Sequence, residues 1–243
     1  MYILGIHVGR HDSACCLFKD QDLVSFCKEE RLTCVKNCGK SFKLLSIDEV
    51  LRIGGIGRKD VDVVAISRYH LPSKCFISRD RLLIEKRREL LGMESNRKLF
   101  TEMARKHEYD ETKLVDIKEL RKFLKVRNDT EIYFSNHHYS HVLGLLRYAK
   151  WDDEALYVSC DGGGDYAYYA AYHLKGKKLR CLCGEDLPTF KNPQNEGASI
   201  GLAYCSVTEL LGFMPNRHEG KITGLAAFGK PVCGEKICSF FKI

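Results

Sequence analysis

Residues 1–28 read MYILGIHVGRHDSACCLFKDQDLVSFCK, and this stretch decides the fold class of the chain. It contains three short apolar runs, at residues 2–8, 13–18 and 23–27, separated by residues 9–12 and 20–22. Short apolar runs bounded by glycine- and aspartate-bearing turns are typical of β-strands. We therefore expect the chain to begin with three consecutive strands joined by tight turns.

Strand and helix patterns alternate after this opening, which predicts an α/β fold. A capping box, Ser46-Ile47-Asp48-Glu49, predicts a short helix that stops near Gly54-Gly55. Further strands are expected at 61–67, 131–135 and 155–160, and a hairpin at 166–174 and 179–183. Helices are expected at 138–149 and at 199–211, the second closed by Gly212. Residues of about 78–127 are charge-rich and predict a helical insertion.

The composition is that of an ordinary globular protein of 243 residues, with 44% apolar and 29% charged residues. No apolar run reaches the roughly 18 residues of a membrane span, and residues 1–6 lack the basic region of a signal peptide. We therefore expect a cytoplasmic protein with no membrane partner. The twelve cysteines include no C-x-x-C pair and are expected to pack as small apolar side chains.

The net charge of +7 raises nucleic acid as a partner class. Acidic residues are interleaved with the basic runs, and no aromatic stacking pattern accompanies them. A solvated helical face therefore explains the charge better than nucleic-acid binding. The basic runs are Lys86-Arg87-Arg88, Arg105-Lys106 and Arg121-Lys122.

The motif His137-His138-Tyr139-Ser140-His141 is the first candidate site. Residues four apart share one face of a helix, so His137 and His141 can converge on one ion while His138 points elsewhere. Asp161, at the end of the next expected strand, can add an oxygen ligand. Two histidines and a carboxylate suit iron(II), manganese or zinc. Without Asp161, histidines that bind nothing would be an almost equal alternative.

Three glycine-bearing segments are weaker candidates. Glycines 162–164, between Asp161 and Asp165, let backbone amides approach a phosphate, although a plain hairpin turn has the same composition. The turn at 9–13 offers His11 for proton transfer, or is an ordinary hairpin. Lys221 and Gly224, in the segment 219–229, can approach a nucleotide, whereas a packed helix with glycine stops is favoured for this segment in isolation.

Together these segments resemble the carbamoyltransferase family that includes the nodulation and antibiotic O-carbamoyltransferases. The matching segments follow one another in family order between residues 3 and 231, and the ordered set is specific although each segment alone is weak. They are Ile3-Leu4-Gly5-Ile6, His11-Asp12-Ser13-Ala14, Glu29-Glu30-Arg31, Lys36, Asn136-His137-His138-Tyr139-Ser140-His141, Asp161-Gly162-Gly163-Gly164-Asp165, Ser199-Ile200-Gly201-Leu202-Ala203-Tyr204, Glu219-Gly220-Lys221 and Gly224-Leu225-Ala226-Ala227-Phe228-Gly229.

The resemblance implies a ribonuclease-H-like fold of the actin and sugar-kinase type, related to the tRNA threonylcarbamoyl-transfer ATPases. It implies a first lobe over 1–150, carrying the insertion, and the start of a second, incomplete lobe over 151–243. By the same resemblance, a carbamoyl-adenylate made from carbamoyl phosphate and ATP donates its carbamoyl group to an acceptor hydroxyl. His137, His141 and Asp161 would hold the metal, typically iron, and His11 and Lys36 would contact the carbamoyl or phosphate end.

The sequence departs from the family pattern at Arg10, where a glycine is usual, and at Asn37, where a histidine is common. Family chains also continue into the rest of the second lobe and a separate adenylate-forming domain. The alternative prediction is therefore a non-catalytic homologue that binds nucleotide or metal, or one half of a split enzyme whose C-terminal half is encoded separately. A small-molecule kinase of the same fold lacks a recognisable sugar-contact motif.

Overall fold

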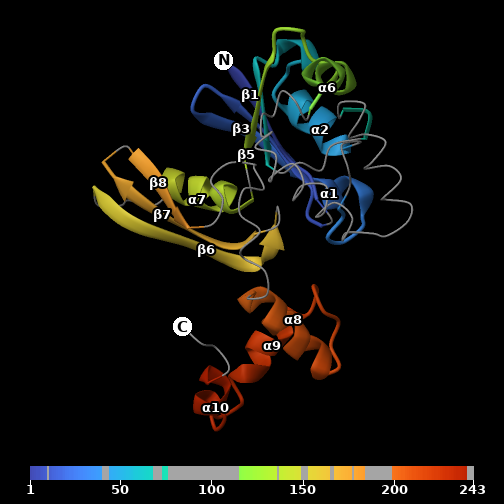
Figure 1. Ribbon diagram of the computed structural model, residues 1–243. Helices are drawn as coiled ribbons and strands as arrows, with labels where there is room; N and C mark the ends of the chain where they lie inside the picture. The colour runs from blue at the N-terminus through green and yellow to red at the C-terminus, as the bar shows by residue number, and fades with distance from the viewer. Residues whose placement is uncertain are drawn as a thin grey trace.

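A five-stranded sheet forms the N-terminal part of the molecule, as Figure 1 shows for the computed structural model. The structure describes residues 1–9, 11–39, 44–67, 73–75, 115–135, 137–148, 153–164, 167–176, 178–183 and 199–239. The strands of this sheet are β1 (Tyr2–His7), β2 (Ala14–Lys19), β3 (Asp22–Lys28), β4 (Val63–Ser67) and β5 (Glu131–Ser135). Each begins and ends within two residues of its expected bounds, which confirms those five predictions.

The strand order is β3-β2-β1-β4-β5, and only β2 runs antiparallel to its neighbours. This order and direction define a ribonuclease-H-like sheet, the unit from which proteins of the actin and sugar-kinase type are built. The α/β fold expected from the sequence is therefore present. Because β1, β4 and β5 are parallel, their carboxyl ends, at His7, Ser67 and Ser135, lie at one edge of the sheet.

One face of this sheet is buried by α2 (Leu45–Ile53) and α6 (Ile117–Leu124). Alternate residues of β1 enter the core, and each fully buried aliphatic side chain stabilises the fold by about 1.5–3 kcal/mol. Residues buried in this core include Leu4, Ile6, Val8, Leu17, Ile47, Val50, Ile66, Leu120 and Leu124.

The start of α2 differs from the expected capping box. Leu44 is the N-cap residue and has no side-chain cap, and Ser46 lies buried inside the helix. The carboxylate of Glu29, in α1 (Glu29–Thr33), instead accepts the amides of Leu45 and Ser46, at 3.1 and 3.0 Å. The capping-box prediction is therefore wrong, because a buried carboxylate from a distant segment supplies the cap.

A second sheet has the order β6-β7-β8, with β6 (Glu154–Gly164), β7 (Ala167–Lys175) and β8 (Lys178–Cys183). The expected hairpin is confirmed, and its turn contains Gly176 in the left-handed region at φ 57°. The expected helix at 138–149 is α7 (His137–Tyr148), which packs on this sheet (Figure 1). The buried residues of this second core are Val142, Tyr157, Ala170 and Tyr172.

Among the described residues, three helices follow the second sheet: α8 (Ile200–Leu210), α9 (Glu219–Ala226) and α10 (Gly234–Cys238). Ser199 caps α8 by accepting the amide of Leu202 at 2.9 Å, and Gly212 follows the helix at φ 78°, as expected. Short 3-10 turns lie at Arg58–Asp60 and Ser73–Cys75. Within the described ranges, no helix has both the length and the apolar character needed to cross a membrane.

Most of the expected insertion at 78–127 lies outside the described residues, and so do the basic runs at 86–88 and 105–106. Its last part is α6, whose Asp116 caps the helix by accepting the amide of Glu119. The third basic run, Arg121-Lys122, lies on this helix; Lys122 is exposed, and Arg121 donates to the Thr130 carbonyl at 2.8 Å. The lobe bounds 1–150 and 151–243 remain predictions, although the two described sheets fall one in each range.

Candidate metal centre

The N-terminus of α7 lies at the carboxyl edge of the first sheet, because β5 ends at Ser135 and α7 begins at His137. Polar side chains follow the same edge. His7 Nδ1 lies 2.8 Å from Ser67 Oγ, and Ser135 Oγ lies 2.7 Å from Ser140 Oγ on α7. The carboxyl ends of parallel strands are the usual place for ligands in open α/β sheets. The topology therefore presents the histidine helix at a position suited to binding.

The structure brings His137, His141 and Asp161 together, as the sequence predicted. His137 Nε2 is hydrogen-bonded to Asp161 Oδ2. His141 Nε2 lies 3.2 Å from His137 Nε2 and 3.4 Å from the same carboxylate oxygen. Two helix residues four apart thus converge with a residue of β6, and His141 remains half exposed.

His138 differs from its expected place. Its side chain does not point away from the cluster: it is buried, with Nδ1 2.8 Å from Ser159 Oγ and Nε2 4.0 Å from Asp161 Oδ1. The i,i+4 rule singled out His137 and His141, but His138 and His141 are also neighbours, three residues apart on the helix. That second spacing was the signal in the sequence that could have included His138.

Asp161 is held by contacts on both its backbone and its carboxylate. The Gly163 amide donates to Oδ1 at 2.6 Å, and the Ser199 hydroxyl donates to the Asp161 carbonyl at 2.9 Å. Burial alone would raise the pKa of this carboxyl, but the hydrogen bonds from His137 and His141 hold it well below its usual range. The carboxylate is therefore a charged oxygen donor.

Glycines 162–164 do not form a separate turn after the strand. β6 continues through Gly164, which pairs with Ala167 across an irregularity in the ladder, and Gly163 has φ 124°. The amide of Gly163 is already bonded to Asp161. The structure therefore assigns that amide to the orientation of the carboxylate, and the phosphate role of these glycines stays a prediction.

Gly201 lies in a matched segment but was not among the predicted site residues, and the structure gives it a packing role beside Asp161. A Cβ at Gly201 would lie 2.3 Å from the Gly162 amide nitrogen and 2.5 Å from the Asp161 carbonyl carbon. The first turn of α8 therefore packs directly on the backbone of the Asp161 segment. The motif Ser199-Ile200-Gly201 provides both the hydroxyl and the close approach that this contact requires.

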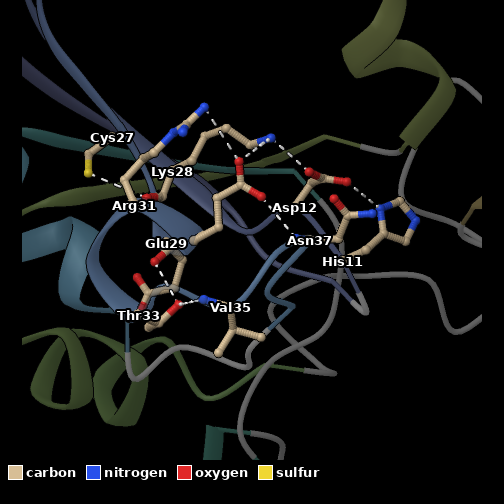
Figure 2. Close-up of polar contacts among 10 residues, drawn as sticks. His11, Asp12, Cys27, Lys28, Glu29, Arg31, Thr33, Val35 and Asn37 are labelled. Carbon is tan, nitrogen blue, oxygen red and sulfur yellow. Dashed lines mark hydrogen bonds and ion pairs between the residues drawn. The ribbon is translucent and has the colours of Figure 1, made fainter. Parts of the chain in front are cut away.

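His11 belongs to a charged cluster at the turn between β1 and β2 (Figure 2). His11 Nδ1 lies 3.0 Å from Asp12, and Lys28 Nζ donates to Asp12 Oδ1 at 2.8 Å. Lys28 also lies 3.4 Å from Glu30, which accepts the Asn37 amide at 2.9 Å. Lys28 was missed from the sequence because a lysine at the end of a strand has no distinctive spacing. Lys36 is exposed on the neighbouring turn.

Replacing Lys28 by Met is expected to raise the pKa of Asp12. The Lys28 hydrogen bond is the main reason that this pKa lies below its usual value, against an opposing effect of burial. A lowered folded-state pKa gives stability that is present above the unfolded-state pKa and is lost as pH falls through the folded value. Lys28→Met should therefore reduce the part of the folding stability that is lost when Asp12 becomes protonated at low pH.

A carbon-13 NMR titration of the Asp12 carboxyl would measure this shift in Lys28→Met and in a control, Lys19→Met. Lys19 lies over the Tyr2 ring, 5.9 Å from its centroid, and should leave the Asp12 titration unchanged. An unaltered Asp12 midpoint in Lys28→Met would contradict the pairing.

Lys221 and Gly224 lie on α9, whereas glycines 162–164 end β6. The Lys221 ammonium is 6.0 Å from the centroid of the Phe213 ring, and Gly224 is exposed. α9 meets α8 through Tyr204 Oη and Thr223 Oγ1, which are 2.7 Å apart. The nucleotide-binding role of Lys221 and Gly224 therefore remains a prediction.

The fold and the site define an α/β protein with a ribonuclease-H-like sheet and a histidine–carboxylate cluster suited to a divalent metal. A family model described as the carbamoyltransferase N-terminus matches residues 2–242, and the chain belongs to this family. The resemblance recognised from the sequence motifs is thereby confirmed.

Similar proteins include an uncharacterized Synechocystis protein, sll1178, at 30% identity, and the nodulation protein NolNO of Sinorhizobium fredii, at 26%. The matches cover 95% and 91% of this chain but only 35% and 28% of those relatives, so the chain spans about a third of their length. Among solved structures, a putative N-acetylmannosamine kinase from Listeria monocytogenes is 14% identical, with a TM-score of 0.46 over 99% of this chain and 75% of that one.

Proposed function

We propose that this chain is the part of a carbamoyltransferase in which a carbamoyl group passes from carbamoyl-adenylate to an acceptor hydroxyl. The convergence of His137, His141 and Asp161, in a chain of the carbamoyltransferase N-terminus family, carries the proposal. The donor would be made from carbamoyl phosphate and ATP. The acceptor would be a small molecule that bears a hydroxyl group.

The residues of the cluster fit a divalent ion. Ligand atoms that share an ion at about 2.1 Å are separated by roughly 3.0–3.5 Å in tetrahedral or octahedral geometry. The separations of 3.2 and 3.4 Å that His141 Nε2 makes with His137 and Asp161 fall in this range. His137 Nε2 and Asp161 Oδ2 lie closer than this, as hydrogen-bonded atoms, and would have to move apart to share the ion. Two imidazoles with one carboxylate favour iron(II). When bound, the ion would polarise the carbamoyl carbonyl and offset charge that develops on oxygen.

The remaining site residues would bind and orient the donor. His11 and Lys36 would contact its carbamoyl or phosphate end, and the Lys28–Asp12 pair would fix the imidazole of His11 through Asp12. Gly162, Gly164, Lys221 and Gly224 would approach the nucleotide. The amide of Gly163 would act indirectly, because it holds Asp161 Oδ1.

The match with this chain covers 35% and 28% of the length of the two relatives. The formation of carbamoyl-adenylate would require residues in the unmatched remainder of such longer proteins. A separately encoded C-terminal half would supply them if the enzyme is split. The second candidate function, a non-catalytic homologue that binds metal or nucleotide, has the same support. Transfer of a carbamoyl group from carbamoyl phosphate and ATP to a hydroxyl acceptor, assayed with the whole protein, distinguishes the two.

His137→Ala is expected to abolish high-affinity binding of iron(II), because it removes one imidazole and breaks the hydrogen bond that orients Asp161. Anaerobic equilibrium dialysis should show one ion bound to the wild-type chain and at least a tenfold weaker association for the variant. The loss of a single ligand interaction worth 1.4 kcal/mol already corresponds to tenfold.

His173→Ala is the matched control, because His173 pairs with Glu154 on β6, at 2.7 Å, and takes no part in the cluster. It should bind iron(II) as the wild type does. Equal binding by wild type and His137→Ala would overturn the metal assignment.

A further inference from the structure

A basic cavity lies beside α6, apart from the candidate metal centre. Its volume is about 650 Å³, which is within the range of small-molecule sites. The described residues that line it include five cations and one carboxylate but no aromatic ring. The charged residues of the lining are Lys59, Lys118, Arg121, Lys122, Lys125 and Glu119.

The cavity and the histidine cluster lie at opposite edges of the first sheet. α6 precedes the amino end of β5, and Lys59 lies in the 3-10 turn that precedes β4. The histidines of α7 instead follow the carboxyl end of β5, at Ser135 (Figure 1). The five residues of β5, at about 3.3 Å each, separate the two edges by about 16 Å. The cavity is therefore a separate site from the one proposed for carbamoyl transfer.

Two of the cations are held in place by backbone carbonyls. Lys59 Nζ donates to the Val126 carbonyl at 2.9 Å, and Arg121 Nε donates to the Thr130 carbonyl at 2.8 Å. An ammonium group has further N–H donors beyond one such bond, and so has a guanidinium. Both side chains can therefore present a positioned charge to a ligand.

The other three cations are close together on α6. Lys118 and Lys122 are four residues apart, and Lys125 follows Lys122 by three, at the C-cap. Like charges at these spacings destabilise a helix. Glu119 lies 3.6 Å from Lys122, but within the described part of the chain no ion pair is formed by Lys118 or Lys125. The repulsion in this group is therefore poorly compensated by the protein itself.

Lys118 is in the least favourable position of the three. It lies in the first turn of α6, where the positive end of the helix dipole also disfavours a cation. Natural proteins break such local rules chiefly at functional sites, where a ligand offsets the loss. An anion in the cavity would neutralise both the repulsion between the lysines and the unfavourable interaction with the dipole.

We propose that this cavity binds a small molecule that bears a diphosphate group. At about −1.5 to −2 for each phosphate, two phosphates carry about three to four negative charges, which matches five cations against one carboxylate. Lysine and arginine are the usual phosphate ligands of proteins. Single-stranded nucleic acid usually also stacks on aromatic rings, which the described lining lacks. This site goes beyond the proposed function and does not depend on it.

Inorganic pyrophosphate is the probe, titrated into the whole chain without added metal. Calorimetry should show one bound ion, and the backbone amides of Lys125 and Asn128 should shift in nitrogen-15 NMR spectra. Inorganic phosphate at equal ionic strength should bind about tenfold more weakly, because it brings half the charge. Shifts at Gly163 without shifts at Lys125 and Asn128 would place the ion near the candidate metal centre and overturn the proposal.

Lys118→Gln with Lys125→Gln should weaken pyrophosphate binding by about tenfold, with a native circular dichroism spectrum. Lys118→Gln alone should raise the Tm in the absence of ligand, because it removes a repelled cation from the first turn of α6. The matched control is Lys178→Gln, since Lys178 is an exposed lysine on β8, and it should bind as the wild type does.

Equal affinity of the double variant and the wild type would overturn the site. A lower Tm for Lys118→Gln would also count against it, because Lys118 would then serve the fold. Tighter binding of a single-stranded RNA oligomer than of pyrophosphate, lost in the double variant, would show a nucleic-acid surface and overturn the small ligand. None of these outcomes bears on the binding of iron(II) by the histidine cluster.

Discussion

Gly201→Ala is expected to disrupt the candidate metal centre, although a Cβ at residue 201 would meet backbone atoms and no ligand side chain. The added Cβ would lie 2.3 Å from the Gly162 nitrogen, 2.5 Å from the Asp161 carbonyl carbon and 2.6 Å from the Gly162 Cα. All three are backbone atoms, so no change of rotamer can relieve the overlap. The start of α8 must move away from β6 by about an ångström, and overpacking of this kind costs about 1–3 kcal/mol.

The displacement should reach Asp161 through two contacts. Ser199, at the cap of α8, donates to the Asp161 carbonyl, and the close approach of Gly201 fixes the same peptide. We expect a lower Tm and at least tenfold weaker binding of iron(II) or cobalt(II), measured by thermal denaturation and equilibrium dialysis.

Gly144→Ala is the matched control for this substitution. Gly144 lies inside α7, and a Cβ there would meet no atom within 4 Å. Alanine in a helix interior is more favourable than glycine by about 0.5–1 kcal/mol, so this variant should be neutral or stabilising. If Gly201→Ala behaves like Gly144→Ala in both assays, the packing of α8 on the Asp161 segment is refuted.

Glu29→Ala is expected to destabilise the part of the molecule built on the first sheet by about 3–5 kcal/mol. Glu29 is 0% exposed, and its carboxylate accepts the amides of Leu45 and Ser46 at the start of α2. Each buried donor that is left without a partner costs about 1–3 kcal/mol. The missing side chain also leaves a cavity. The negative charge of Glu29 also interacts favourably with the helix dipole at the N-terminus of α2, and the substitution removes this interaction.

Urea denaturation followed by circular dichroism would measure this loss. Glu29→Gln keeps the shape and one acceptor oxygen, so its stability should fall between those of wild type and Glu29→Ala. Glu49→Ala is the control on the same helix, because Glu49 forms an exposed i,i+3 pair with Arg52 and should change little. Equal stability of Glu29→Ala and Glu49→Ala would show that Glu29 is not the cap of α2.

The strands were predictable because their signal is local. Alternate residues of β1 enter the core, and turns bound the runs, so the sequence located β1 to β5 within two residues. The pairing of β1 with β4, which makes the sheet ribonuclease-H-like, joins residues about 60 positions apart. No local pattern specifies that pairing, and the expectation of this fold came from the ordered family motifs.

The site was predictable where spacing along one helix sufficed. The interval of four residues placed His137 and His141 together, and Asp161 was proposed from its place at the end of an expected strand, although β6 continues past it. The exclusion of His138 failed because its position depends on Ser159, which lies on β6. Lys28 was missed for a related reason, since its pairing with Asp12 joins the ends of two different strands.

The sequence by itself determined the α/β class, the family, and the three residues expected to hold a metal. These follow from short-range periodicity and from motifs in a fixed order. Only the tertiary structure decided that His138 lies within the cluster, that Glu29 caps α2, and that Gly201 packs on the Asp161 backbone. Each depends on burial or on the close approach of segments separated in the chain. The three-residue spacing from His141 allows the position of His138 but does not specify it, and no local spacing indicates the other two.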